Sequence, residues 1–142
     1  MIEYTDEVHI DAPPAEVWAV ITDADRASVW MSVVRSAERD GPLEAGSTVR
    51  SRASFLGLSF DVENEITEAD EPHRYALHGQ KPFPTSLLFE LSVSGGGTDV
   101  RATTRVDPGK FFPVPGAVLK RQVKKQMEAD SRNLKKLVEQ GS

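Results

Sequence analysis

The residue with the clearest potential for acid–base chemistry is Asp130, because it interrupts an otherwise apolar helical stripe. Gln126 precedes it by one helical turn and Leu134 follows it by one turn. Burying a carboxylate without a partner is costly, and desolvation raises its pKa. An interior acid with a raised pKa suits general acid or base catalysis, as a dehydratase or cyclase requires. The alternative is a structural role, in which Asp130 reaches a neighbouring arginine or hydroxyl group near the helix edge.

Other polar side chains are expected on the interior side of different strands: Ser51, Asn64, Tyr75 and Thr104. Ligand pockets are mostly apolar with a few converging hydrogen-bonding groups, and this set has that character. Each residue also has a structural interpretation, because serine and threonine are common in strands and tyrosine often leaves its hydroxyl at an edge. Trp30 is expected near the mouth of such a pocket, whereas Trp18 is expected to pack in the core.

Several kinds of chemistry find no support in the sequence. The three histidines, His9, His73 and His78, are not spaced as a metal-ligand pair with a third ligand nearby. There is no cysteine, and therefore no thiolate nucleophile or cysteine-bound metal. The only glycine-rich run, residues 95–97, lies between two expected strands and is typical of a hairpin turn. We therefore predict neither a metal nor a cofactor.

Length and composition indicate an ordinary folded domain spanning residues 1–142. Hydrophobic residues make up 39% and charged residues 27% of the chain, and the formal net charge is −5. This acidic balance disfavours nucleic acid and anionic lipid as partners. No apolar run approaches the roughly 20 residues of a membrane span, which argues against integral membrane association, and the first residues do not resemble a signal peptide. We expect a cytoplasmic, soluble protein, either monomeric or homodimeric.

The order of secondary structure follows from hydrophobic periodicity and turn residues. Residues 3–10 predict a strand, Asp11-Ala-Pro-Pro starts a helix, and Asp23 to Val29 predicts a second short helix. Six further strands are expected between turn signals: Val33–Arg39, Thr48–Phe55, Ser59–Ala69, Arg74–Gly79, Ser86–Ser94 and Asp99–Asp107. Short turns require these strands to pair antiparallel.

The last segment predicts a helix of about 25 residues after Phe111-Phe-Pro-Val-Pro-Gly116. Its apolar stripe contains Leu119, Val123, Gln126 or Met127, Asp130, Leu134 and Leu137, and its other side is rich in lysine and arginine. The only apolar surface available to this stripe is one face of the sheet. Because successive side chains of a strand point to opposite faces, the residues of the apolar face are every second residue of each strand. They are the alternate positions of Val49–Phe55, Phe60–Ile66, Leu87–Val93 and Val100–Val106, together with Tyr75 and Leu77. The intervening charged residues are expected to face water.

With this arrangement the chain resembles the SRPBCC superfamily, also described as START-like, Bet v 1-like or polyketide cyclase/dehydrase-like. The resemblance covers nearly the whole chain. Its motifs are Val8-His-Ile-Asp-Ala-Pro-Pro-Ala-Glu-Val-Trp18, Ile21 to Trp30, Gly41 to Gly46, Ile66 to Tyr75 and Asn133-Leu-Lys-Lys-Leu137. These residues supply packing, caps and turns, so the resemblance implies a fold and transfers no catalytic residue. The implied fold is α+β: a helix-grip fold in which a curved antiparallel sheet of about seven strands surrounds the long helix, in the order β-α-α-β6-α.

Two functional hypotheses follow. The first is a binding module that holds a small apolar molecule, such as a lipid or an aromatic polyketide, between sheet and helix. The second is a cofactor-independent polyketide cyclase or dehydratase that uses Asp130 with Tyr75 or Asn64; a weaker third is delivery of a lipid or quinone to a partner protein. The residues predicted to bind the ligand are Trp30, Ser51, Phe60, Val62, Asn64, Tyr75, Leu77, Phe89, Leu91, Thr104, Val123, Gln126, Met127 and Asp130.

Overall fold

A computed structural model describes residues 1–141 of the chain and has the predicted helix-grip fold. The strands are β1 (Ile2–Ile10), β2 (Val34–Asp40), β3 (Thr48–Phe55), β4 (Leu58–Asp70), β5 (Arg74–Lys81), β6 (Thr85–Ser94) and β7 (Gly97–Val106). The helices are α1 (Pro14–Ile21), the 3₁₀ helix η1 (Ala24–Arg26), α2 (Ala27–Trp30) and α3 (Gly116–Gln140). The predicted short helix after α1 is therefore divided between η1 and α2. Asp23 caps η1 by accepting a hydrogen bond from the backbone N–H of Asp25 at 3.0 Å.

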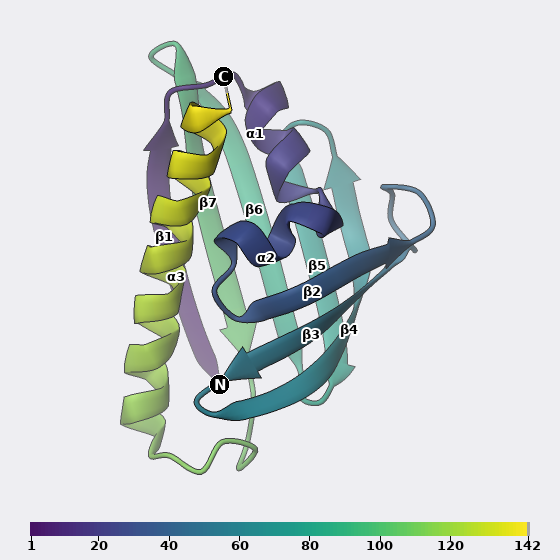
Figure 1. Cartoon of the computed structure of the whole chain (residues 1–142), viewed down its shortest axis with the longest axis vertical. Helices are drawn as coiled ribbons and strands as arrows, with labels where there is room; N and C mark the ends of the chain where they lie inside the picture. The colour runs from purple at the N-terminus through teal and green to yellow at the C-terminus, as the bar shows by residue number, and fades with distance from the viewer. Residues whose placement is uncertain (142) are drawn as a thin grey trace.

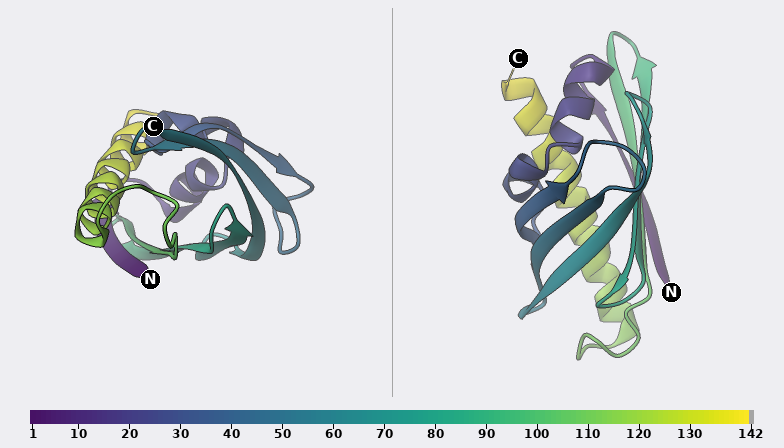
Figure 2. Two further views of the ribbon diagram at one scale, coloured as in Figure 1. Left: turned by 90° about the horizontal axis from the view of Figure 1, so that it is seen from below. Right: turned by 90° about the vertical axis from the view of Figure 1, so that its right-hand side faces the viewer.

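The strands form one antiparallel sheet in the order β1-β7-β6-β5-β4-β3-β2. Register shifts between β2 and β3 and between β4 and β5 mark irregularities of the bulge type, which bend strands and increase twist. The sheet is strongly curved, so that β2, β3 and β4 cross in front of the other strands in Figure 1. Helix α3 lies across the concave side, and the left view of Figure 2 shows the sheet and α3 surrounding the interior.

The two sheet faces have the predicted chemistry. Val100 and Ala102 of β7 are buried on the concave face. Between them, Arg101 reaches Glu7 of β1 on the outer face, with Nε and Oε1 3.7 Å apart. The prediction is wrong for Val93, which has inward parity but is 75% exposed. Val93 lies next to the Gly95–Gly96 turn of the β6–β7 hairpin, and this hairpin extends beyond the helices (Figure 1).

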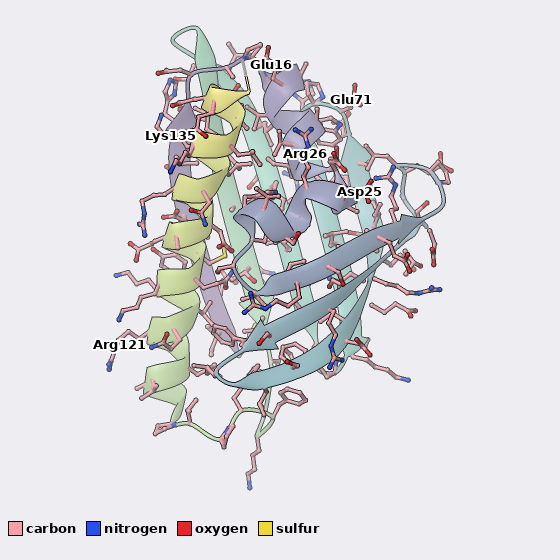
Figure 3. The ribbon with its side chains drawn as sticks, in the orientation of Figure 1. Glu16, Asp25, Arg26, Glu71, Arg121 and Lys135 are labelled. Atoms are coloured by element: carbon pink, nitrogen blue, oxygen red, sulfur yellow. The ribbon has the colours of Figure 1, made fainter. Side chains whose placement is uncertain are left out.

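Helix α3 buries the predicted stripe. Its buried residues are Leu119, Val123, Met127, Asp130, Leu134 and Val138. At the C-terminal end of the stripe the buried residue is Val138. Leu137, which was predicted there, is half-buried beside it. On the opposite side the cationic residues face solvent, and Figure 3 shows one of them, Arg121, projecting away from the sheet. Burial on one side only is what a helix with 3.6 residues per turn produces when it rests on an apolar sheet.

The two edge strands of the sheet are covered by helical segments. At one edge, Lys135 of α3 donates from Nζ to the backbone carbonyl of His9 in β1 at 2.8 Å. The backbone N–H of Asp11, just beyond β1, donates to Oε2 of Glu139 at 2.9 Å. At the other edge, β2 contacts η1 and α2, and Arg39 donates to the carbonyl of Thr22 at 3.1 Å.

Candidate functional site

The interior between α3 and the concave face of the sheet contains a cavity of about 180 Å³. Its walls come from α2, strands β2, β3, β4, β6 and β7, the loops after β5 and β7, and α3, so the cavity is a product of most of the fold. Most lining side chains are apolar, among them Val62 of β4, Phe89 of β6 and Val123 of α3. The few polar lining residues are Ser51, Asn64, Thr85, Thr104, Gln126, Asp130 and Ser131.

One end of the cavity is lined by four members of a cluster of five phenylalanines: Phe55, Phe60, Phe83 and Phe112 line it, and Phe111 packs behind them. Their ring centroids lie 5.1 to 6.0 Å apart, mostly in edge-to-face geometry, which the ring quadrupoles favour. Three connections supply them: the β3–β4 hairpin, the β5–β6 turn and the loop before α3. The prediction missed the cavity-lining members Phe55, Phe83 and Phe112. Parity places Phe55 on the inner face of its strand, and for Phe83 and Phe112 the only signal is that bulky aromatic residues stand in proline-rich turns, where small or polar residues are usual.

Asp130 lies in the cavity wall and is only 4% exposed. Its Oδ1 accepts a hydrogen bond from the backbone N–H of Ser32 at 2.9 Å, and its Oδ2 accepts one from Nε2 of Gln126 at 2.6 Å. Within residues 1–141 no lysine, arginine or histidine forms an ion pair with it. Burial raises the pKa of Asp130 above the usual range of an aspartate, although the hydrogen bonds from Ser32 and Gln126 act in the opposite direction.

The same carboxyl group also has a structural role. By accepting from Ser32, Asp130 holds the segment between α2 and β2 against α3, and Asn133 adds a second bond from Nδ2 to the carbonyl of Trp30 at 3.2 Å. The two interpretations of Asp130 are therefore compatible, because it anchors a neighbouring segment and also faces a cavity. The hydroxyl partner expected for the structural role is present, because the Ser32 side chain also hydrogen-bonds to Asp130, and the carboxamide of Gln126 stands where an arginine was the other expectation.

Two polar groups of the cavity wall have no hydrogen-bond partner in the described chain. They are the indole N–H of Trp30 and the side-chain carbonyl oxygen of Asn64, and both atoms are buried. Trp30 is 3% exposed and packs edge-to-face on Phe89, with ring centroids 5.9 Å apart. Buried polar groups are usually satisfied, so each of these two atoms carries an unmet hydrogen bond.

Most of the predicted ligand-binding residues line the cavity. They are Trp30, Ser51, Phe60, Val62, Asn64, Phe89, Thr104, Val123, Gln126, Met127 and Asp130. Tyr75, Leu77 and Leu91 lie outside this lining. Tyr75 packs instead against Trp18 of α1 and stacks on Phe89, at centroid distances of 5.9 and 6.5 Å, and burial raises its pKa to about 12. Tyr75 and Leu91 are buried in the core as parity predicted, and Leu77 is half-buried against it.

The histidines lie away from the cavity. His9, on the outer face, pairs through Nδ1 with Asp99 at 2.7 Å, and this hydrogen bond raises the pKa of His9. His73 is exposed, and His78 bonds through Nδ1 to the hydroxyl of Ser86 at 2.8 Å. Residues 1–141 contain no cluster of three or more side chains suited to hold a metal ion. Over the same residues, no helix combines the length and apolar character of a membrane span.

A helix-grip fold with a cavity under its long helix defines a class of protein, and the sequence of this chain matches a family model of that class. The chain belongs to the family described as polyketide cyclase/dehydrase and lipid transport, whose model matches residues 1–139. This places it in the SRPBCC superfamily, as the motifs indicated. A search of curated proteins found no matching sequence.

Solved structures share the fold at low sequence identity. A START superfamily protein from Mycobacterium smegmatis is 15% identical and covers 99% of each chain, with a TM-score of 0.80. Ara h 8.0201 is 19% identical and covers 96% of each chain, with a TM-score of 0.70. The di-domain ARO/CYC protein BexL from the BE-7585A biosynthetic pathway is 17% identical, with a TM-score of 0.73; the match covers 95% of this chain and 49% of BexL.

Proposed function

We propose that the protein binds a compact apolar molecule in the cavity between α3 and the sheet. The observation that carries this proposal is an apolar cavity in the interior, where close packing is the rule. The family description, which combines polyketide cyclases and dehydrases with lipid transport, supports a hydrophobic ligand.

The cavity volume limits the size of this ligand. Apolar cavities of about 150 Å³ bind benzene, and pockets for drug-sized molecules measure about 300–1,000 Å³. At about 180 Å³, the cavity accommodates a single aromatic ring with a short substituent or a medium-length alkyl chain. A sterol or a polycyclic aromatic molecule requires the walls to move apart.

A cavity-filling variant tests this proposal. Ala102 lines the cavity and is 7% exposed, so Ala102→Leu places additional carbon atoms inside it. We expect wild type to bind octanol in isothermal titration calorimetry and Ala102→Leu to bind it at least about tenfold more weakly. Ala19→Leu, on the exposed side of α1, is the matched control and should bind as wild type does. Equal octanol affinity in wild type and Ala102→Leu, or no binding to wild type, refutes the proposal.

A second candidate function is proton-transfer catalysis, and the position of Asp130 favours it. A buried carboxyl with a raised pKa, in a cavity wall and without a cationic partner among residues 1–141, can take a proton from carbon next to a ligand carbonyl and return it. Asn64 is the other predicted catalytic group that lines the cavity, whereas Tyr75 lies outside the lining. Cyclases and dehydratases both depend on such transfers.

Hydrogen exchange on a bound ketone tests the catalytic candidate. Indanone in deuterium oxide should exchange its α-hydrogens faster with wild type than with Asp130→Asn, as followed by NMR. Asparagine retains the oxygen that accepts from Ser32, so binding of indanone should persist in the variant. Equal exchange rates for the two proteins, with indanone bound to both, contradict this function.

A further inference from the structure

A surface groove lies directly outside the cavity, between the N-terminal half of α3 and the start of β2 with the β3–β4 hairpin. Figure 1 shows this hairpin beside the lower half of α3. Val33, Phe55 and Gln126 line both the groove and the cavity. These three side chains therefore form a wall between the apolar interior and solvent. The wall is made of side chains from β3, α3 and the residue before β2, with no helix or strand crossing it.

The groove carries two cations and, among the described residues, no acidic one. Arg35 enters from β2 and Lys125 from α3, and no aspartate or glutamate of residues 1–141 lines the groove. Both cations are exposed, and neither forms an ion pair or hydrogen bond in the described part of the chain. This is unusual for the sheet. Among residues 1–141, every other arginine within a strand is paired, as Arg50 is with Asp40 at 2.7 Å, or bonds to a backbone carbonyl, as Arg39 does.

We propose that this groove holds the carboxylate of an amphipathic ligand whose apolar part occupies the cavity. The inference rests on the proposed function and specifies its ligand class: a compact apolar carboxylic acid, such as a medium-chain fatty acid or an arylalkanoic acid. The guanidinium group of arginine matches a carboxylate with two parallel donors, and lysine adds a second positive charge. With the carboxylate in the groove and the chain inside, the ligand passes between Val33, Phe55 and Gln126.

Within the described chain, one carboxyl group lies close to this wall on the cavity side. It is Asp130, which accepts from Gln126 at 2.6 Å. Both oxygens of Asp130 already accept hydrogen bonds, from Ser32 and Gln126, and burial raises its pKa. The two cations lie in the groove, where the ligand carboxylate stays in contact with water and loses little hydration.

Paired probes of equal chain length test the inference. Octanoate and octanol differ in charge but both place an alkyl chain in the cavity, and their affinities are measured by isothermal titration calorimetry near neutral pH. We expect Arg35→Gln and Lys125→Gln each to weaken octanoate binding about three- to fivefold, the effect of one solvent-accessible ion pair. Octanol binding should stay within about twofold of wild type. Added salt should weaken the binding of octanoate only.

Lys136→Gln is the control, because Lys136 is an exposed cation of α3 outside both the groove and the cavity lining. It should leave the affinity for both probes unchanged. If octanol binds and octanoate affinity is unaffected by Arg35→Gln and Lys125→Gln, the groove does not hold the carboxylate, and cavity binding stands by itself. If wild type binds neither probe, both the cavity proposal and the groove proposal are wrong.

Discussion

Replacing Asp130 with asparagine should stabilise the protein increasingly as the pH rises. Burial raises the pKa of Asp130 in the folded state above its value of 3.8 in the unfolded chain. Between these two pKa values the folded state retains a proton that the unfolded state releases, so the free energy of unfolding falls with rising pH. Below this window both states are protonated and the contribution vanishes; above it the loss is complete and constant. The loss therefore grows with pH and is largest above the raised pKa of Asp130.

The magnitude follows from the single proton involved. One differentially bound proton changes the free energy of unfolding by at most about 1.4 kcal/mol per pH unit. The side chain introduced by Asp130→Asn cannot ionise, and its oxygen still accepts from the N–H of Ser32. Subtracting the wild-type free energy from that of Asp130→Asn should give a difference that increases with pH by up to this slope and then reaches a plateau. Urea unfolding followed by circular dichroism from about pH 4 to about pH 8 measures it.

Two variants separate the effect of ionisation from other effects. Asp70→Asn removes an exposed carboxyl that makes no ion pair or side-chain hydrogen bond among the described residues, and its difference from wild type should be small at every pH. Asp130→Ala also removes the acceptor for Ser32, which should cost about 1 kcal/mol throughout the range. A difference for Asp130→Asn that is flat, or that decreases with pH, would show that burial does not dominate the energetics of this carboxyl.

Further predictions concern a close backbone approach and an outer-face ion pair. Gly79→Ala should destabilise the protein by about 1–3 kcal/mol in urea unfolding, because its Cβ would lie 2.5 Å from the carbonyl oxygen of Glu63 and closer still to the side-chain oxygen of Asn64. Gly116→Ala, at the start of α3 with no heavy atom within 4 Å of the new Cβ, should instead stabilise it by about 0.4–1 kcal/mol; equal effects would contradict the steric argument. NMR titration should give His9 a pKa above its ordinary 6.5, and Asp99→Asn should lower it, because the hydrogen bond between them favours the protonated ring. The stabilisation from this pair is fully present below the ordinary histidine pKa and is lost as the pH rises through the raised value; an unchanged pKa in Asp99→Asn would assign the shift to another group.

The fold could be predicted because the two-residue period of the strands and the 3.6-residue period of the long helix are both clear in this chain. Charged residues such as Arg101 alternate with apolar ones along the strands, and α3 has apolar residues on one side only. Asp130 could be located in the interior because it interrupts that apolar side. Parity, however, assigns a residue to a face and says nothing about which part of the face a neighbouring element covers. Tyr75 therefore has the predicted orientation and still contacts Trp18 of α1, outside the cavity lining.

The phenylalanine cluster at one end of the cavity could not be predicted from these periods, for a different reason. Phe83 and Phe112 stand in irregular connections, where there is no period to indicate which way a side chain faces. Their proximity depends on how three separate connections meet after the sheet has curved. The same holds for the groove, because Arg35 and Lys125 are 90 positions apart in the sequence and only the placement of α3 brings them to one surface.

The covered edges of the sheet affect how molecules of this protein can meet. An uncovered edge strand presents a row of backbone donors and acceptors that can recruit a strand from another molecule. Here Lys135 and Glu139 of α3 occupy backbone groups at the β1 end, and η1 and α2 flank β2. Strand addition at the occupied end of β1, or along the part of β2 that η1 and α2 flank, therefore first requires a helix to detach, and loosening of α3 or α2 should favour aggregation.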